Sequence, residues 1–95
     1  MVIVITYDEN GGQWDHVAPR KGDKLGPGTR VPALVISPYS KMGTVDHTQY
    51  DTASVLRLIT RRFGLTPLPG LVARDQALTA NGGKPMGDLT QALNL

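Results

Sequence analysis

A short run of β-branched apolar residues, Val2–Ile5, is followed after two residues by a pair of carboxylates, Asp8 and Glu9. The run does not alternate between apolar and polar residues, which is typical of a strand covered on both faces, as in a parallel sheet. In open α/β sheets the ligand crevice lies beyond the carboxyl ends of the strands. The sequence therefore predicts a buried strand that carries two acids to such an edge.

The two acids suit a divalent cation, because hard metal ions take carboxylate oxygens and a strand fixes the position of its last residues. The alternative is a tight hairpin, since Asn10-Gly11 is a strong type I′ turn signal and the residues on either side could be its arms. Spacing alone does not decide between a metal edge and a hairpin.

Two histidines directly follow an aspartate, and each has both a functional and a purely structural interpretation. His16, next to Asp15, could bind a metal, protonate a leaving group or stabilise developing charge. An ordinary surface histidine is the favoured alternative when the residues are taken alone. His47 could return to the same sheet edge, but we favour a local role in which it hydrogen-bonds its loop and Asp51 caps the next helix.

A long loop and a second strand come next along the chain. Residues 8–30 are rich in Gly, Pro, Asp and Lys and predict a long loop, which is uncommon in a compact domain and often functional. Arg30–Ser37 predicts a second buried strand, with Pro32 among its first residues, where a missing N–H is tolerated.

One amphipathic helix is predicted to begin near Asp51 or Thr52 and to end at Gly64. Its apolar face recurs at helical spacing and consists of Val55, Leu56, Ile59 and Phe63. The arginines on the other side predict a solvated face and are Arg57, Arg61 and Arg62. A loop-rich tail follows, with a short helix over 73–79 and a helical turn or two within 87–93.

Composition limits the class of protein. A chain of 95 residues forms at most one small domain, and its net charge of +2 is too low to indicate a nucleic-acid partner. The chain has no cysteine, so disulfides and thiol nucleophiles are excluded. Its apolar runs are far shorter than a membrane span, and no signal peptide is visible. Two buried strands and one helix cannot cover each other's apolar faces, so the sequence predicts a piece of a larger α/β sheet.

Several motifs in this order resemble the bacterial phosphoesterase family of phospholipases C and acid phosphatases. The segments that carry the resemblance are Thr6–Gly12, Trp14–Val17, Gly26–Pro32, Val35–Pro38, Val45–Asp51, Ser54–Arg57, Arg62–Leu65, Arg74-Asp75 and Gly87–Thr90. Together they extend over nearly the whole chain. We therefore expect residues 1–95 to form a single partial domain, the C-terminal portion of a phosphoesterase catalytic domain.

The resemblance implies an alkaline-phosphatase-like α/β sandwich, to which this chain contributes two buried, parallel strands, one amphipathic helix and the tail. It implies that Asp8 and Glu9 are ligands of a divalent metal ion, which could be Mg, Ca, Mn or Zn. His16 would lie in the same active-site loop as a tentative catalytic residue, and Asn10 and His47 are further candidates. No serine or threonine of this chain matches the nucleophile motif of the family.

The implied function is metal-dependent hydrolysis of phosphate esters in a full-length protein, with the 95-residue chain inactive alone. The alternative is a non-catalytic remnant of the fold that self-associates or binds a partner. Expected partners are a phosphate-ester substrate and either further copies of the chain or the N-terminal portion of the domain. The full-length family would be secreted or periplasmic, and this sequence does not fix the compartment.

Overall fold

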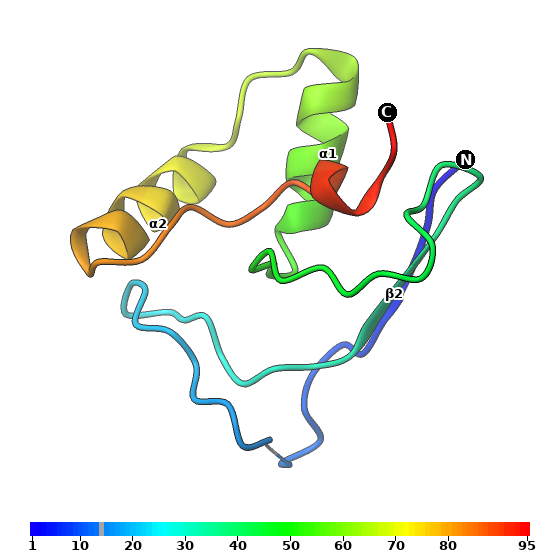
Figure 1. Ribbon diagram of the computed structural model, residues 1–95. Coiled ribbons are helices and arrows are strands. Elements are labelled where there is room, and N and C mark those ends of the chain that lie inside the picture. The colour runs from blue at the N-terminus through cyan, green and yellow to red at the C-terminus, as the bar shows by residue number, and fades with distance from the viewer. Residues whose placement is uncertain (14) are drawn as a thin grey trace.

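The computed structural model describes residues 1–13 and 15–95, so Trp14 of the Trp14–Val17 motif lies outside the described residues. The elements follow in the order β1 (Ile3–Thr6), β2 (Ala33–Ile36), α1 (Ser54–Phe63), α2 (Pro69–Ala80) and a 3-10 helix (Thr90–Ala92). Figure 1 shows the paired strands apart from the two helices, with long irregular segments between them. The chain is mixed α/β, as the sequence predicts. None of the described helices has the length and apolar character needed to cross a membrane.

The two strands pair antiparallel, with Ile3 opposite Ile36 and Thr6 opposite Ala33. The prediction of a parallel pair is therefore wrong. Parallel neighbours need a crossover that returns the chain along the sheet, usually through a helix. The segment between the strands contains no helix among its described residues, and the chain comes back beside β1 in the opposite direction.

The strands also lie at the surface, contrary to the prediction that both are buried. Opposite residues of an antiparallel pair share a face. One face of the pair, here called the ribbon face, therefore gathers Ile3, Ile5, Leu34 and Ile36, which are 40%, 52%, 62% and 48% exposed. No helix of the described chain packs closely on this face, and its apolar side chains stay in contact with solvent.

The buried core lies in the second half of the chain. Its apolar residues are Leu78 of α2 and three residues of the tail, Met86, Leu89 and Leu93. The tail runs from α2 past α1 and ends beside the exit of β2 (Figure 1), where the Asn94 N–H donates to the Tyr39 carbonyl at 2.7 Å. The tail therefore supplies most of the core and links the helices to the strand pair.

The predicted end of the first helix agrees with the structure better than the predicted helix beginnings do. Helix α1 ends at Gly64, whose φ of +62° is the left-handed conformation that suits glycine at a helix end. It begins at Ser54, after the N-cap Ala53, and no side chain caps it. Helix α2 is longer than the predicted 73–79, because Pro69 starts it at a position where proline needs no N–H. The 3-10 helix matches the helical turn expected in the tail.

Helix α1 turns one of the arginines predicted to be solvated, Arg57, toward the rest of the described chain, whereas Arg61 and Arg62 are exposed as predicted. Its apolar side chains Leu56, Ile59 and Phe63, here called the helix face, are 44%, 41% and 65% exposed. The side chain of Arg57, by contrast, is only 12% exposed. The apolar face is present in the sequence as predicted, but nothing in the described part of the chain covers it.

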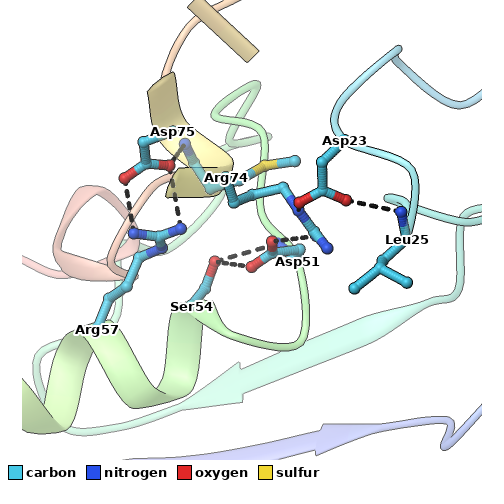
Figure 2. Close-up of polar contacts among 8 residues, drawn as sticks. Asp23, Leu25, Asp51, Ser54, Arg57, Arg74 and Asp75 are labelled. Atoms are coloured by element: carbon cyan, nitrogen blue, oxygen red, sulfur yellow. Dashed lines mark hydrogen bonds and ion pairs between the residues drawn. The ribbon is translucent and has the colours of Figure 1, made fainter. Parts of the chain in front are cut away.

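Arg57 joins three segments through one carboxylate (Figure 2). Its two terminal nitrogens donate to both oxygens of Asp75 in α2, at 2.7 and 3.0 Å. Oxygen Oδ1 of Asp75 also accepts the Met86 N–H at 3.2 Å. This bidentate geometry is the strong form of the arginine–carboxylate pair. It ties α1 and α2 to the start of the tail.

Arg74 of α2 makes a second link, to the long loop after β1. Its Nε donates to Asp23 at 2.7 Å, and a terminal nitrogen lies 3.6 Å from Asp51, just before α1. The Asp51 N–H donates to the Ser54 hydroxyl at 3.1 Å, which fixes the entry to α1. Ion pairs thus connect segments that share few buried apolar contacts.

The Asp75→Ala variant should lower the free energy of unfolding by about 2–3 kcal/mol, because it leaves the mostly buried Arg57 guanidinium without its partner. Urea unfolding followed by circular dichroism measures this change. The matched control is Arg61→Ala, which breaks an ion pair whose arginine side chain is 66% exposed and should cost at most about 1 kcal/mol. Equal costs for the two variants would contradict a central role for the Arg57–Asp75 pair.

Gly87→Ala should also destabilise the chain, by about 1–3 kcal/mol. A Cβ at this buried position would lie 2.6 Å from both the Thr48 methyl group and the Tyr50 ring. The control is Gly70→Ala in α2, where a Cβ meets nothing and alanine favours the helix. Thermal melting should show a lower midpoint for the first variant and an unchanged or higher one for the second. A Gly87→Ala variant as stable as the natural chain would refute this packing.

Candidate functional site

The acidic pair lies just beyond the end of β1, at the start of a turn. Asp8 Oδ1 accepts the Glu9 N–H at 3.1 Å, and Glu9 Oε2 accepts the Gly11 N–H at 2.7 Å. The turn closes where the Gln13 N–H donates to the Asn10 carbonyl at 3.0 Å. These local bonds hold both carboxylates at the strand end while their side chains remain exposed to solvent.

The predicted turn signal is real, but it does not build a hairpin. Gly11 and Gly12 both have positive φ, +62° and +76°, which only glycine adopts readily. The residues described on either side of the turn form no strand, and β1 pairs with β2 instead. The hairpin alternative therefore fails for the described residues, and the acids lie at the edge of the β1–β2 pair.

A hollow of about 500 Å³ opens beside the residues that flank the acidic pair, Tyr7 and Asn10, while Asp8 and Glu9 themselves do not line it. Its lining residues come from the segment after β1 and from the approach to β2, and they are Tyr7, Asn10, Gln13, Asp15, Arg30, Val31 and Pro32. Asn10 is held in place by its Nδ2, which donates to the Thr29 hydroxyl at 2.5 Å. The antiparallel pairing creates this hollow, because it sets the end of β1 beside the beginning of β2.

Arg30 and Asp15 form an ion pair at the wall of the hollow. Arg30 Nε donates to Asp15 Oδ2 at 2.6 Å. The Val17 N–H and the Arg30 guanidinium both hydrogen-bond the Asp15 carboxylate and hold its pKa below the ordinary value of 3.8. Nε is the only Arg30 nitrogen with a hydrogen bond among the described residues. The wall of the hollow therefore holds a permanent cation with one of its nitrogens engaged by Asp15.

The donor set matches a divalent metal ion only in part. Asp8 and Glu9 offer hard carboxylate oxygens, as such ions require. In residues 1–13 and 15–95, however, no three metal-binding side chains come together in a group that could hold an ion. Neither His16 nor His47 completes the acidic pair. The carboxylates of this chain fit one part of a metal site and are too few to form one.

The two histidines are both exposed and lie in separate loops. His16 follows the ion-paired Asp15, at the edge of the residues that line the hollow. The loop of His47 is held by its neighbour, since Asp46 accepts the Thr48 N–H at 2.9 Å and the Tyr50 hydroxyl at 2.5 Å. The local interpretation named the wrong residues: Asp46 rather than His47 makes these bonds, and no side chain caps α1, so Asp51 is not its cap.

The three serines of the chain, Ser37, Ser40 and Ser54, have structural partners. The Ser37 hydroxyl accepts the Tyr39 N–H, and the Ser40 hydroxyl donates to the Val35 carbonyl, so both stabilise the turn after β2. Ser54 is 1% exposed and interacts with Asp51 at the start of α1. None of these three hydroxyls faces the hollow beside the acidic pair.

Sequence reasoning missed Arg30 and the hollow. The signal was present, because Arg30 directly precedes the second strand and Asp15 follows the turn. It could be used only if the strands were taken as antiparallel, since parallel strands would place the start of the second one at the far end of the first.

Comparison with known proteins adds a family to this geometry. Residues 1–66 match the Phosphoesterase family. Phospholipase C B of Mycobacterium tuberculosis is 36% identical over 116 residues, which cover 97% of this chain and 21% of that protein. Non-hemolytic phospholipase C of Pseudomonas aeruginosa is 32% identical over 97% of this chain and 17% of its own length. Non-specific phospholipase C1 of Arabidopsis thaliana is 33% identical over 68% of this chain. No solved structure matches.

The chain belongs to the phosphoesterase family. The family match covers more than half of its residues and includes both strands, the acidic pair and the whole of α1. The resemblance predicted from the motifs is thereby confirmed. The chain spans about one fifth of the length of the curated relatives it matches.

Tyr50, in the loop that contains His47, should lose its proton only at an unusually high pH. Burial and the hydrogen bond to Asp46 raise the pKa of Tyr50 to about 12 from an ordinary value of 10.0. Because the phenol binds its proton more tightly in the folded state, its stabilising contribution is complete below pH 10 and is lost as the pH rises through 12. Phenolate absorbance should show one late-titrating tyrosine that Tyr50→Phe removes. Ordinary titration of all three tyrosines would contradict this contact.

Proposed function

We propose that this chain forms one wall of an active site that hydrolyses phosphate esters, as part of a larger phosphoesterase domain. The single observation that carries the proposal is the placement of Asp8 and Glu9 just beyond β1, between Tyr7 and Asn10, which line the same hollow as Arg30. The family match includes all five of these residues. The similar proteins of M. tuberculosis, P. aeruginosa and A. thaliana are phospholipases C, which supports a phosphodiester of a lipid as one substrate class.

Asp8 and Glu9 would serve as two of the ligands of a divalent cation, with the others supplied by residues outside this chain. Such an ion, when bound, neutralises negative charge on phosphoryl oxygens. Carboxylate donors favour Mg, Ca or Mn, and a histidine ligand such as His16 would admit Zn. The exposed carboxylates at a strand end support this role, because each keeps oxygens that no described residue occupies.

Arg30 would contribute binding of the phosphoryl group. A guanidinium is permanently charged and matches phosphate oxygens in a bidentate way. Asp15 holds the Arg30 Nε and so orients the side chain toward the hollow, while Asn10 contributes an amide to the same wall. The engaged serines at 37, 40 and 54 support the proposal that the nucleophile comes from another part of the domain. The complete domain would then be the alkaline-phosphatase-like sandwich that the motifs imply.

The test uses two forms of the protein. The 95-residue chain alone should show no turnover of phosphomonoesters or phosphodiesters, because a covalent mechanism needs a nucleophile. A chimera, in which this chain replaces its matched segment in phospholipase C B of M. tuberculosis, should hydrolyse a chromogenic phosphorylcholine ester. Metal-dependent turnover by the isolated chain, abolished by Asp8→Ala, would overturn the division of the site between two parts.

In the chimera, Asp8→Asn should lower kcat/KM by at least about 100-fold, because the substitution removes a charged oxygen donor while keeping the shape of the side chain. Arg30→Met should act mainly through KM, since it removes ground-state and transition-state binding together. The control is Arg20→Met, which makes the same change as Arg30→Met at an exposed arginine that does not line the hollow, and it should leave kcat/KM unchanged. An Asp8→Asn chimera as active as its parent would refute the role of the acidic pair.

The second candidate function is a non-catalytic remnant that self-associates. The exposed ribbon face and helix face favour it. Light scattering on the isolated chain distinguishes the two: stable oligomers, together with an inactive chimera that folds, would support the remnant.

A further inference from the structure

The loop after β1 holds a cluster of exposed basic side chains. Of the ten lysines and arginines in the chain, four arginines form ion pairs and six have no acidic partner among the described residues. Three of these six lie within five consecutive positions and are Arg20, Lys21 and Lys24, all exposed to solvent. Half of the six therefore lie in one short stretch, residues 17–25, here called the basic segment.

Asp23 is the only acid of the basic segment, and its charge is balanced from another element. Arg74 Nε of α2 donates to Asp23 Oδ2 at 2.7 Å, and the Leu25 N–H donates to Oδ1 of the same carboxylate at 2.8 Å. Because Asp23 is paired with α2, it does not neutralise the three cations beside it. The basic segment therefore presents a positive surface to solvent.

The basic segment ends in a tight turn that is anchored to α2. The Gly26 N–H donates to the Asp23 carbonyl at 3.3 Å, and the Asn81 amide after α2 donates to the Gly22 carbonyl at 3.2 Å. Figure 1 shows this turn beside the C-terminal end of α2. Leu25 lies in the turn and is 81% exposed. An apolar side chain on an anchored turn loses less conformational freedom on binding than one on a flexible chain.

The other end of the basic segment is fixed at the hollow. The Val17 N–H donates to Asp15 Oδ1 at 2.9 Å, and Asp15 lines the hollow. Val17 itself is exposed. The segment therefore leads from the wall of the candidate site to the anchored turn, and it combines three cations with two exposed apolar side chains. Cations beside exposed apolar side chains are typical of surfaces that bind at a membrane interface.

We propose that the basic segment docks the protein on an anionic lipid surface, with its cations at the phosphate headgroups and Leu25 inserted among them. A negative membrane surface attracts clusters of lysine and arginine. An apolar side chain gains free energy when it enters the boundary of the acyl chains. The choice of a lipid surface rests on the proposed function, because a lipid phosphodiester would be bound at such a surface and the segment starts at the wall of the hollow.

A nucleic acid fits the basic segment less well. Proteins that bind single strands stack bases on aromatic rings, and residues 17–25 contain no aromatic residue. The net charge of +2 also gives the whole chain little attraction for a nucleic acid. The exposed Leu25 would gain nothing against a charged phosphate backbone. A lipid surface is therefore the partner that uses both the cations and the apolar tip.

Vesicle binding by the 95-residue chain tests the proposal without any turnover. The chain should sediment with phosphatidylcholine vesicles that contain phosphatidylglycerol, and much less with vesicles of phosphatidylcholine alone. Binding to the anionic vesicles should fall as salt is raised, because salt screens the attraction between the cations and the headgroups.

The charge variant replaces the three cations of the basic segment with glutamine and combines Arg20→Gln, Lys21→Gln and Lys24→Gln. Its partition constant for the anionic vesicles should fall by about 100-fold, because each basic residue at such a surface contributes roughly fivefold. Circular dichroism should show that the variant folds like the parent, since the replaced side chains are exposed.

The matched control removes the same charge from three exposed cations elsewhere and combines Lys41→Gln, Arg62→Gln and Lys84→Gln. It should lower the partition constant by about threefold at most, because charges outside the docking surface act only through the screened net charge. The comparison separates the basic segment from the overall charge of the chain.

Leu25→Ser tests the apolar tip of the basic segment. The substitution should lower the partition constant for the anionic vesicles by about tenfold, because it removes the side chain that enters the acyl boundary. The control is Val45→Ser, at a side chain that is 79% exposed in another loop, and it should leave the partition constant unchanged.

Three results would overturn the proposal. The first is an equal loss of binding in the charge variant and its control, which would show that net charge alone acts. The second is binding that does not distinguish the two kinds of vesicle. The third is binding of a DNA duplex that the charge variant abolishes, without any vesicle binding, which would assign the segment to a nucleic acid.

Failure of docking and failure of the proposed function give different results. The chromogenic ester is soluble and needs no lipid surface, so an inactive chimera would overturn the proposed hydrolysis, while vesicle binding by the chain would still support docking. An active chimera, together with a chain that binds no anionic vesicles, would overturn docking alone.

Discussion

The bidentate ion pair between Arg57 and Asp75 is the interaction on which the folded part of the chain depends. With few buried apolar side chains, the helices cannot be held by hydrophobic burial alone. The pair joins α1 to α2, and the same carboxylate fastens the start of the tail. The tail then supplies three of the buried apolar residues, Met86, Leu89 and Leu93. A polar contact thus positions the small core.

The orientation of α1 follows from this pair and explains the exposed faces. Because Arg57 faces α2, the apolar side of the same helix must face away from the described chain. The ribbon face is exposed for a similar reason, because α1 and α2 interact with each other and with the tail and do not cover the strands. The structure uses the charges of Arg57, Asp75, Arg74 and Asp23 to join its segments and leaves its apolar faces exposed. This division fits a segment that completes a larger phosphoesterase domain.

Local signals in the sequence predicted the elements well and their assembly poorly. The two strands, the end of α1 at Gly64 and the turn at the acidic pair were all predictable, because glycine conformation and β-branched runs act within a few residues. Strand direction was not, since it depends on whether the long loop carries a crossover helix. The role of Arg57 was missed because helical spacing cannot tell a solvated charge from one whose partner lies 18 positions away. Because the strands were predicted to be parallel, Arg30 was not placed near the candidate site. Asp8 and Glu9 were found from their position after a strand.

The central claim is that the acidic pair is part of a metal site that other residues of the domain complete. Calorimetric titration with Mn²⁺ tests it most directly. The isolated chain should bind no manganese at millimolar concentration, because two carboxylates provide too few ligands, whereas the chimera should bind it and lose that binding when Glu9 is changed to glutamine. Tight binding by the isolated chain, or a folded chimera that binds manganese equally well after Glu9→Gln, would contradict the account.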